Sequence, residues 1–230
     1  MQQYERYKDS GVEWIGKIPE AWEEIKLKHL FRWEKGSNAA TYTNDYVAEN
    51  KGDFPVFSGQ TEKDGILGFI NTYDYDFDKE VLIVTTVGAK AMSIKKVFGK
   101  FSLSQNCALI IPKDNKSSSL YFFYYLQRLF AYEKSIISLI MQPSLRFEDL
   151  NLYTAYRFST EQQIAIANYL DCKTAEIDEL IAQKEQLLEL YEEEKAATIN
   201  QAVTKGIDPD VRMQDSGLDW LGGGVLRGGN

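Results

Sequence analysis

Five lysines stand in a stretch of the chain, Val81 to Lys113, that contains no carboxylate. Lysine ammonium groups bind phosphate oxygens, and the local field of such a cluster steers a ligand more than the net charge of the whole chain. This stretch therefore indicates the binding of an anionic partner such as a nucleic acid. Its lysines are Lys90, Lys95, Lys96, Lys100 and Lys113.

The net charge of −8 does not contradict this interpretation, because the acidic excess lies elsewhere in the chain. Residues 1–160 hold 20 Lys and Arg against 20 Asp and Glu, so this part is neutral. Residues 161–230 hold 6 against 14, which accounts for the whole excess. The overall acidity therefore does not exclude DNA as a partner.

Residues that could catalyse a reaction do not form a recognisable set. The single histidine, His29, cannot build a histidine metal site, and a structural role is the ordinary one. Asp74 and Asp76 would share one face of a strand, where a solvated edge is more ordinary than a metal site. The sequence has no phosphate-binding loop, dinucleotide-binding turn or nucleophile elbow. We therefore expect no catalytic residue and no metal ligand in this chain.

From Leu30 to about Ile111 the sequence pattern predicts mainly strands and turns, and these elements position the lysines. Apolar, β-branched runs at Glu80–Val87 and Cys107–Pro112 predict two buried strands. Ser118–Ile137 has a helical pattern, and we expect its aromatic side chains in the core. A loop and a last strand are expected to follow. The pattern predicts an α+β fold with a globular domain and a mainly antiparallel or mixed sheet.

One long helix is predicted after this domain. Ser159 or Thr160 is a candidate N-cap with glutamine three residues later, and no Pro or Gly occurs until Gly206, a candidate C-cap. Apolar residues three and four positions apart predict a coiled-coil face. No second helix of matching length is present, so we expect pairing with another chain. The pairing residues are Leu170, Ile177, Ile181, Leu188 and Tyr191.

Composition indicates a cytoplasmic protein. No apolar run approaches the ~18 residues that a membrane span needs, and the N-terminus is too polar for a signal peptide. Cys107 and Cys172 are far apart and lack metal-ligand spacing. This fits a reducing compartment, where each is expected to be a buried structural thiol.

A short repeat divides the chain. DSGVEWIG at residues 9–16 recurs as DSGLDWLG at residues 215–222. Trp14 and Ile15 are expected to anchor packing where the globular domain meets the helix. The predicted parts are a domain at 1–158, a spacer helix at 159–206, and the start of a second copy at 207–230. This second copy breaks off after Gly222 and is expected to be partly disordered.

Several segments, in this order, resemble specificity (S) subunits of type I restriction–modification systems. The resemblance begins in the N-terminal run from Tyr7 to Phe31 and continues in SGQTEKDGILGFINTY and FSLSQNCALI. It extends through the long helical segment and the junction VTKGIDPDVRMQDSGLDWLG. Together these motifs cover nearly all of residues 1–222.

The resemblance implies a DNA-recognition subunit that catalyses nothing and holds no cofactor itself. Each target-recognition domain of such a subunit reads one half of a bipartite DNA site, and long helices pair antiparallel to space the domains. Methyltransferase (M) subunits dock on them and methylate adenine with S-adenosylmethionine. A motor-nuclease (R) subunit uses ATP and Mg. Because one domain and one helix are present here, we expect a half-length form that pairs with a second copy.

The loops beside the two predicted buried strands are the candidate DNA-binding sites. Lys and Arg would bind phosphates, whereas Gln, Asn and Ser would bind base edges. For each residue, an ordinary surface or turn role is the alternative. The candidates are Gln60, Thr61, Lys63, Lys90, Ser93, Lys95, Lys96, Ser104, Gln105, Asn106, Gln142, Ser144 and Arg146.

Two other functions remain open from the sequence. The chain could be a scaffold that binds the methyltransferase subunit without reading DNA. It could also be a nuclease, although Glu193, Glu194 and Lys195 lie in the predicted helix and are typical of a salt-bridged surface. The target DNA sequence does not follow from one amino-acid sequence, because base choice depends on loop geometry and DNA shape.

Overall fold

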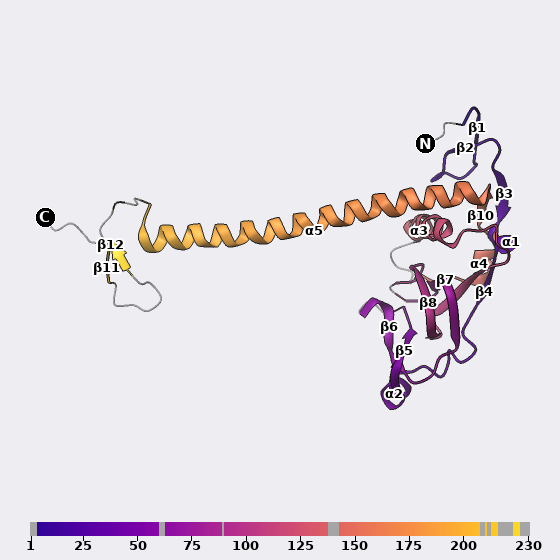
Figure 1. Ribbon diagram of the computed structural model, residues 1–230, viewed down its shortest axis with the longest axis horizontal. Coiled ribbons are helices and arrows are strands. Elements are labelled where there is room, and N and C mark those ends of the chain that lie inside the picture. Colours follow the sequence, from indigo (N-terminus) through magenta and orange to yellow (C-terminus); the bar gives the residue numbers. More distant parts are fainter. Residues whose placement is uncertain are drawn as a thin grey trace. The chain divides into compact units, whose positions relative to one another are not determined.

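The computed structural model describes residues 4–59, 63–88, 90–137, 143–207, 210, 213–215 and 223–225. These residues form two compact units, Met1–Leu170 and Asp171–Asn230. The first unit holds the sheet and the shorter helices, and the second holds most of the long helix (Figure 1). The expected α+β fold with a long helix is confirmed.

A six-stranded mixed sheet forms the centre of the first unit (Figure 1). Neighbouring strands are antiparallel except for one parallel pair, β5 with β8. The predicted buried strands are two adjacent members of it, β7 and β9. In spatial order the strands are β4 (Phe31–Glu34), β9 (Cys107–Pro112), β7 (Tyr75–Thr85), β8 (Ile94–Leu103), β5 (Lys51–Phe57) and β6 (Ile66–Ile70).

Short elements connect and cover the sheet. Two further pairs are antiparallel: β1 (Tyr7–Asp9) with β2 (Lys17–Pro19), and β3 (Glu23–Lys26) with β10 (Thr154–Arg157). The connecting helices are α1 (Leu27–Leu30), α2 (Asn44–Glu49), the 3-10 turn η1 (Lys63–Gly65) and α4 (Phe147–Leu152).

The loop expected before the last strand contains helix α4, which the sequence pattern did not indicate. The Arg146 backbone N–H donates to the Asp149 carboxylate at 3.3 Å, which caps the helix N-terminus. Leu150 is fully buried and holds this turn against the core. A helix of 6 residues is too short to show a 3.6-residue period in sequence.

Alternating side chains of β7 pack on opposite faces of the sheet. Leu82 and Val84 face helix α3 (Ser119–Ile136), whereas Ile83 belongs to a second apolar cluster with Phe101. Tyr121, Phe122 and Tyr125 are buried in the α3 cluster, so the aromatic run is core, as predicted. The strand alternation of side chains thus gives the sheet two apolar faces. The buried residues of the α3 face also include Leu126, Leu129 and Phe130.

Helix α5 (Thr160–Lys205) begins and ends at the predicted caps. Ser159 Oγ accepts from the Gln162 N–H at 3.2 Å, and Gly206 adopts φ 77° after the last turn. Gln163 is buried and hydrogen-bonds the backbone of Ser118, Lys116 and Phe158. The first turns of α5 pack on the core, and the first compact unit includes them as far as Leu170.

The first copy of the short repeat lies beside this packing. Trp14 and Ile15 are partly buried against the cluster that contains Ala167 of α5. The Trp14 and Tyr125 rings are 5.4 Å apart. This agrees with the expected anchoring role.

Of the second repeat, the structure describes only Asp215. This residue ends β11 (Met213–Asp215), which pairs antiparallel with β12 (Gly223–Val225). Residues 216–222 lie outside the described residues.

One expectation about a single residue is wrong. Cys107 is buried, but Cys172 is exposed on α5 and is not a core thiol. His29 is exposed at the end of the one-turn helix α1, because only Leu27 and Leu30 of that turn face the core. No helix within the described ranges is long and apolar enough to cross a membrane.

Candidate nucleic-acid interface

Four predicted segments meet where strand β7 ends. The Thr86 N–H donates to the Asn106 carbonyl at 2.7 Å, and the Thr86 carbonyl accepts from the Leu145 N–H at 2.8 Å. The Met92 N–H donates to the Thr85 carbonyl at 2.8 Å, which closes the loop between β7 and β8. These bonds hold the loops of Lys90, Ser104–Asn106 and Ser144–Arg146 beside one another.

The fourth segment joins through Gly59. A Cβ on Gly59 would lie 2.3 Å from Cγ2 of Thr85, so the end of the SGQ segment touches the end of β7. Gly59 also has φ +68°, a conformation that L residues rarely adopt. Three of the predicted residues, Gln60, Thr61 and Gln142, lie outside the described residues. Lys63 begins η1, but its side chain is also outside them.

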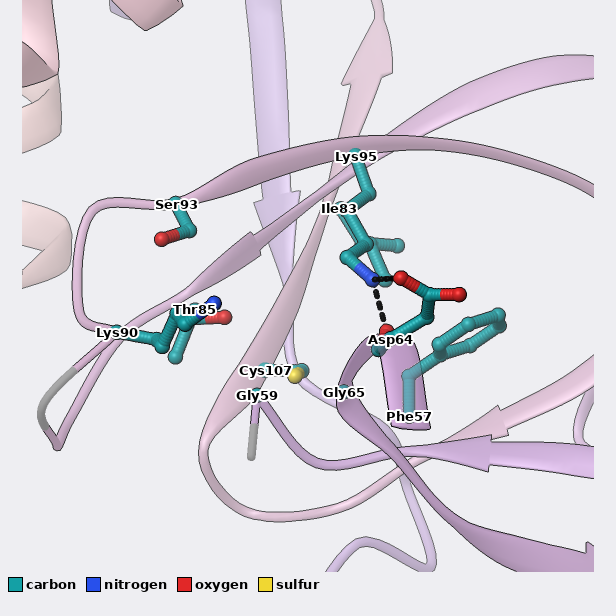
Figure 2. Close-up of a pocket in the computed structure, with 10 residues that line it drawn as sticks. All are labelled: Phe57, Gly59, Asp64, Gly65, Ile83, Thr85, Lys90, Ser93, Lys95 and Cys107. Atoms are coloured by element: carbon teal, nitrogen blue, oxygen red, sulfur yellow. Dashed lines mark hydrogen bonds and ion pairs between the residues drawn. The ribbon is translucent and has the colours of Figure 1, made fainter. Parts of the chain in front are cut away.

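A cationic pocket of about 160 Å³ lies at this end of the sheet (Figure 2). Three predicted residues line it: Lys90, Ser93 and Lys95. Lys95 Nζ donates to the Asp64 carbonyl and lies 4.0 Å from its carboxylate. The Asp64 side chain is 97% exposed, and exposed ion pairs of this kind contribute at most about 1 kcal/mol. Such a weak pair leaves Lys95 able to bind a phosphate.

Cys107 also lines the cationic pocket, but its thiol is not activated. Burial raises the pKa of the Cys107 thiol from 9.0 to about 12, although a hydrogen bond to Thr85 opposes this. The thiol therefore stays neutral near pH 7 and is a poor nucleophile. The cationic pocket is suited to binding an anion rather than to covalent chemistry.

A second cavity of about 360 Å³, the neutral groove, has no charged residue among the described residues that line it. Ser104, Gln105 and Asn106, three of the predicted DNA-binding residues, line it. The lining as a whole is Ala39, Ala40, Tyr42, Thr43, Asn44, Ser58, Leu67, Ser104, Gln105 and Asn106. Amide and hydroxyl groups without a charge can hydrogen-bond neutral donors and acceptors, which is the chemistry of base edges.

Buried hydroxyl groups mark the same region. Ser58, Thr86 and Ser104 are 6%, 2% and 7% exposed. Their hydroxyl oxygens have no hydrogen-bond partner within the described structure. A buried polar group without a partner costs free energy, so three of them close together call for an explanation. Ser58 and Ser104 both line the neutral groove, where a ligand would reach them.

A third cavity, of about 370 Å³, is lined by Thr86 and carries cations. Arg146 and Lys35 line it together with Ser144, and Glu148 supplies one opposing charge. The Asn106 bond to Thr86 connects this cavity to the neutral groove. A backbone bond thus connects the neutral groove to a cavity that carries cations.

The remaining lysines of the acid-free stretch lie elsewhere. Lys96 follows Lys95 on β8 but lies 5.1 Å above the Phe123 ring of α3, on the opposite face of the sheet. Lys100 stands 4.7 Å from the Tyr73 ring, and Lys113 donates to the Lys28 carbonyl at 2.7 Å. The sequence cluster of five lysines is therefore not one surface patch.

Several residues that line these cavities lie in segments that no sequence motif marked as a binding site. Tyr42, Thr43 and Asn44 reach the neutral groove from a segment about 60 residues before Ser104. The parallel pairing of β5 with β8 brings Ser58 to the groove as well. Pairing between strands that lie so far apart in the sequence leaves no local sequence pattern. Within the part of the chain that the structure describes, no three His, Cys, Asp or Glu residues form a metal-ligand group.

A family model and curated proteins match this chain. The model of the type I restriction modification DNA specificity domain matches residues 19–190. A putative type I specificity subunit of Mycoplasma pneumoniae is 48% identical over 75 residues, which cover 32% of this chain and 24% of that protein. The EcoDI specificity subunit of Escherichia coli is 25% identical over 201 residues, 87% of this chain and 42% of that protein. The chain thus spans less than half the length of these relatives.

Solved structures share the fold. A chain from a structure of the type I R-M system superposes with a TM-score of 0.61 at 18% identity, over 87% of this chain and 49% of that one. The S subunit of Mycoplasma genitalium gives a TM-score of 0.51 at 17% identity, over 80% and 46%.

The family match covers both the sheet that carries the three cavities and most of helix α5. The chain belongs to the family of type I restriction–modification DNA specificity domains.

Proposed function

We propose that this chain reads one half of a bipartite DNA target within a type I restriction–modification complex. Two copies, paired through α5, would present two recognition units related by a two-fold axis. The target would then be a palindrome interrupted by a spacer, because symmetric proteins bind symmetric half-sites.

The convergence of the predicted segments at the end of β7 is the observation that carries the proposal. Lys90 and Lys95 lie in one cavity and Arg146 in another, with the neutral groove connected to both by backbone bonds. Cations bind phosphates without regard to sequence, whereas neutral amides and hydroxyls discriminate base edges. This division of charge is what a DNA-reading surface requires.

Catalysis belongs to partners in this proposal. Methyltransferase subunits would dock on the chain and use S-adenosylmethionine, and a motor-nuclease subunit would use ATP and Mg. The chain itself would hold no cofactor. Its contribution to the reaction is to select the DNA that the partners modify.

Mapping methylated adenines tests the proposal directly. Cells that express this chain with its methyltransferase subunit should methylate one interrupted palindrome. The purified pair should then bind a duplex containing that site at least 10³-fold more tightly than a scrambled duplex, at stated salt. Methylation without a common sequence, or equal affinity for both duplexes, would leave only a scaffold that binds the methyltransferase subunit.

A further inference from the structure

The turn Ser104–Cys107, the amide turn, carries two amide side chains at its tip. The Cys107 N–H donates to the Ser104 carbonyl at 3.1 Å, which closes a β-turn with Gln105 and Asn106 as its central residues. These two residues are exposed, whereas the two that flank them are buried. The DNA major groove is about 12 Å wide and can admit a projecting tip of this size.

A second segment lines the neutral groove beside the amide turn. A Cβ on Gly36 would lie 2.9 Å from the Leu103 carbonyl oxygen, so the segment that begins there touches the residue just before the amide turn. Ala40 and Asn44 of this segment are exposed and line the same groove. A third amide and a methyl group therefore lie at the groove together with the two amides of the turn.

The buried part of the lining is uncharged as well. Ala39 supplies another methyl group, and Leu67 is partly buried beside it in the lining. Burial raises the pKa of Tyr42 to about 12, so its hydroxyl stays neutral near pH 7. The described residues of the groove thus offer a ligand neither a cation nor a carboxylate.

The four bases present different groups in the major groove. Guanine presents two acceptors, which arginine or lysine binds, and cytosine presents an amino group, which a carboxylate binds. Adenine presents an acceptor beside an amino group, which matches the amide of asparagine or glutamine. Thymine presents a methyl group, which packs on an apolar side chain.

The groove holds the side chains that suit one of these pairs. Its three amides match adenine, and its methyl groups match thymine. A G·C pair would meet no guanidinium, ammonium or carboxylate group among the described lining residues, because the cations lie in the other two cavities. The amides are Asn44, Gln105 and Asn106, and the methyl groups belong to Ala39, Ala40 and Leu67.

We propose that the neutral groove reads an A·T pair of the half-site from the major groove, with the amide turn on the adenine and Ala40 against the thymine methyl group. This pair is distinct from the one that holds the methylated adenine, because a base must leave the stack to be methylated. The inference deepens the proposed function and rests on it. It concerns one position of the half-site, so it can fail while DNA reading stands.

Base analogues in the duplex test this assignment. After the half-site is mapped by methylation, each A·T pair outside the methylated one is changed singly, to 7-deazaadenine to remove the N7 acceptor or to uracil to remove the methyl group. At one position 7-deazaadenine should raise the dissociation constant about threefold or more, and uracil about two- to fourfold. If no such position responds, or the half-site contains none, the inference is wrong.

Variants of the amide turn connect that position to the groove. In the double variant Gln105→Ala, Asn106→Ala, the 7-deazaadenine duplex and the natural duplex should bind equally, because the amides that bind N7 are absent. Asn115→Ala, at an exposed turn outside the three cavities, is the matched control and should keep the full effect. An effect that persists in the double variant would place the adenine against other residues and overturn the assignment.

A cation on the amide turn should change the base that is preferred. Either Gln105→Arg or Asn106→Arg should shift the methylated sites from A·T towards G·C at the same position, because arginine binds guanine in the major groove. If neither variant shifts it, or if the double alanine variant relaxes a G·C position instead, the A·T assignment fails and selective methylation by the original chain still supports DNA reading. Methylation without a common sequence by the original chain would refute the proposed function itself.

Discussion

The backbone N–H of Thr86 donates a 2.7 Å hydrogen bond to the carbonyl oxygen of Asn106. This bond joins the end of strand β7 to the turn before strand β9, and it links the neutral groove to the cavity of Arg146. The side chains of Gln105 and Asn106 are exposed at the groove, while their backbone is fixed to the sheet. A rigid backbone with exposed amides is suited to reading base edges.

Replacing Gln105 or Asn106 by alanine should therefore weaken binding to the cognate site selectively. We expect each to cost about 1–3 kcal/mol of cognate affinity and to leave binding to random duplex unchanged. Fluorescence anisotropy with both duplexes measures the difference. Asn115→Ala, at an exposed turn outside the cavities, is the control. An equal loss on both duplexes would assign the amides to the phosphate backbone instead.

Lys95 and Lys96 should behave differently although they are adjacent. Lys95→Ala removes a cation from the pocket at the end of β7, so affinity should fall on every sequence and the salt slope should drop by about 1. Lys96→Ala removes a cation that lies over Phe123 on the other face, so the slope should change less. DNA titrations at several salt concentrations measure the two slopes. A larger change for Lys96→Ala than for Lys95→Ala would place the DNA on the α3 face.

Ser104→Ala should weaken DNA binding without lowering the free energy of unfolding. The Ser104 hydroxyl is buried and has no partner within the described structure, so its removal should leave the free energy of unfolding unchanged or raise it by about 1 kcal/mol. If a base edge meets this hydroxyl, the same variant should bind the cognate duplex more weakly. Urea unfolding and anisotropy are the two measurements. Loss of stability together with unchanged binding would indicate a purely structural hydroxyl.

The local parts of the fold follow from the sequence, and the cavities do not. The caps at Ser159 and Gly206 and the strand Cys107–Pro112 could be predicted because each depends on neighbouring residues. The neutral groove depends on the parallel pairing of β5 with β8, which joins segments about 45 residues apart. The opposite directions of Lys95 and Lys96 follow from strand alternation, but only once Ile94–Leu103 is known to be a strand.

Alkaline pH should reveal the burial of Cys107. Burial raises the pKa of this thiol from 9.0 to about 12, so the folded state disfavours the thiolate that the unfolded chain forms. The contribution of the buried neutral thiol to the free energy of unfolding is fully present below pH 9. It is lost as the pH rises toward 12. Between pH 9 and 10 the free energy of unfolding should fall by about 1 kcal/mol more in the original chain than in Cys107→Ala. Parallel pH dependences would show that the thiol is accessible in the folded state.

The arrangement of the loops at the end of β7 should depend on the glycine at position 59. Gly59→Ala would place Cβ 2.3 Å from Thr85 and also impose φ +68° on an L residue, so either the segment after β5 or the end of β7 must move. We expect a loss of at least about 2 kcal/mol in the free energy of unfolding and a loss of selective DNA binding. Gly88→Ala is the matched control, because Gly88 also has a positive φ, +104°, but no atom of the described residues, apart from its chain neighbours, lies within 4 Å of its added Cβ. A similar cost for both variants would show that backbone strain, and not the contact with Thr85, sets the effect at Gly59.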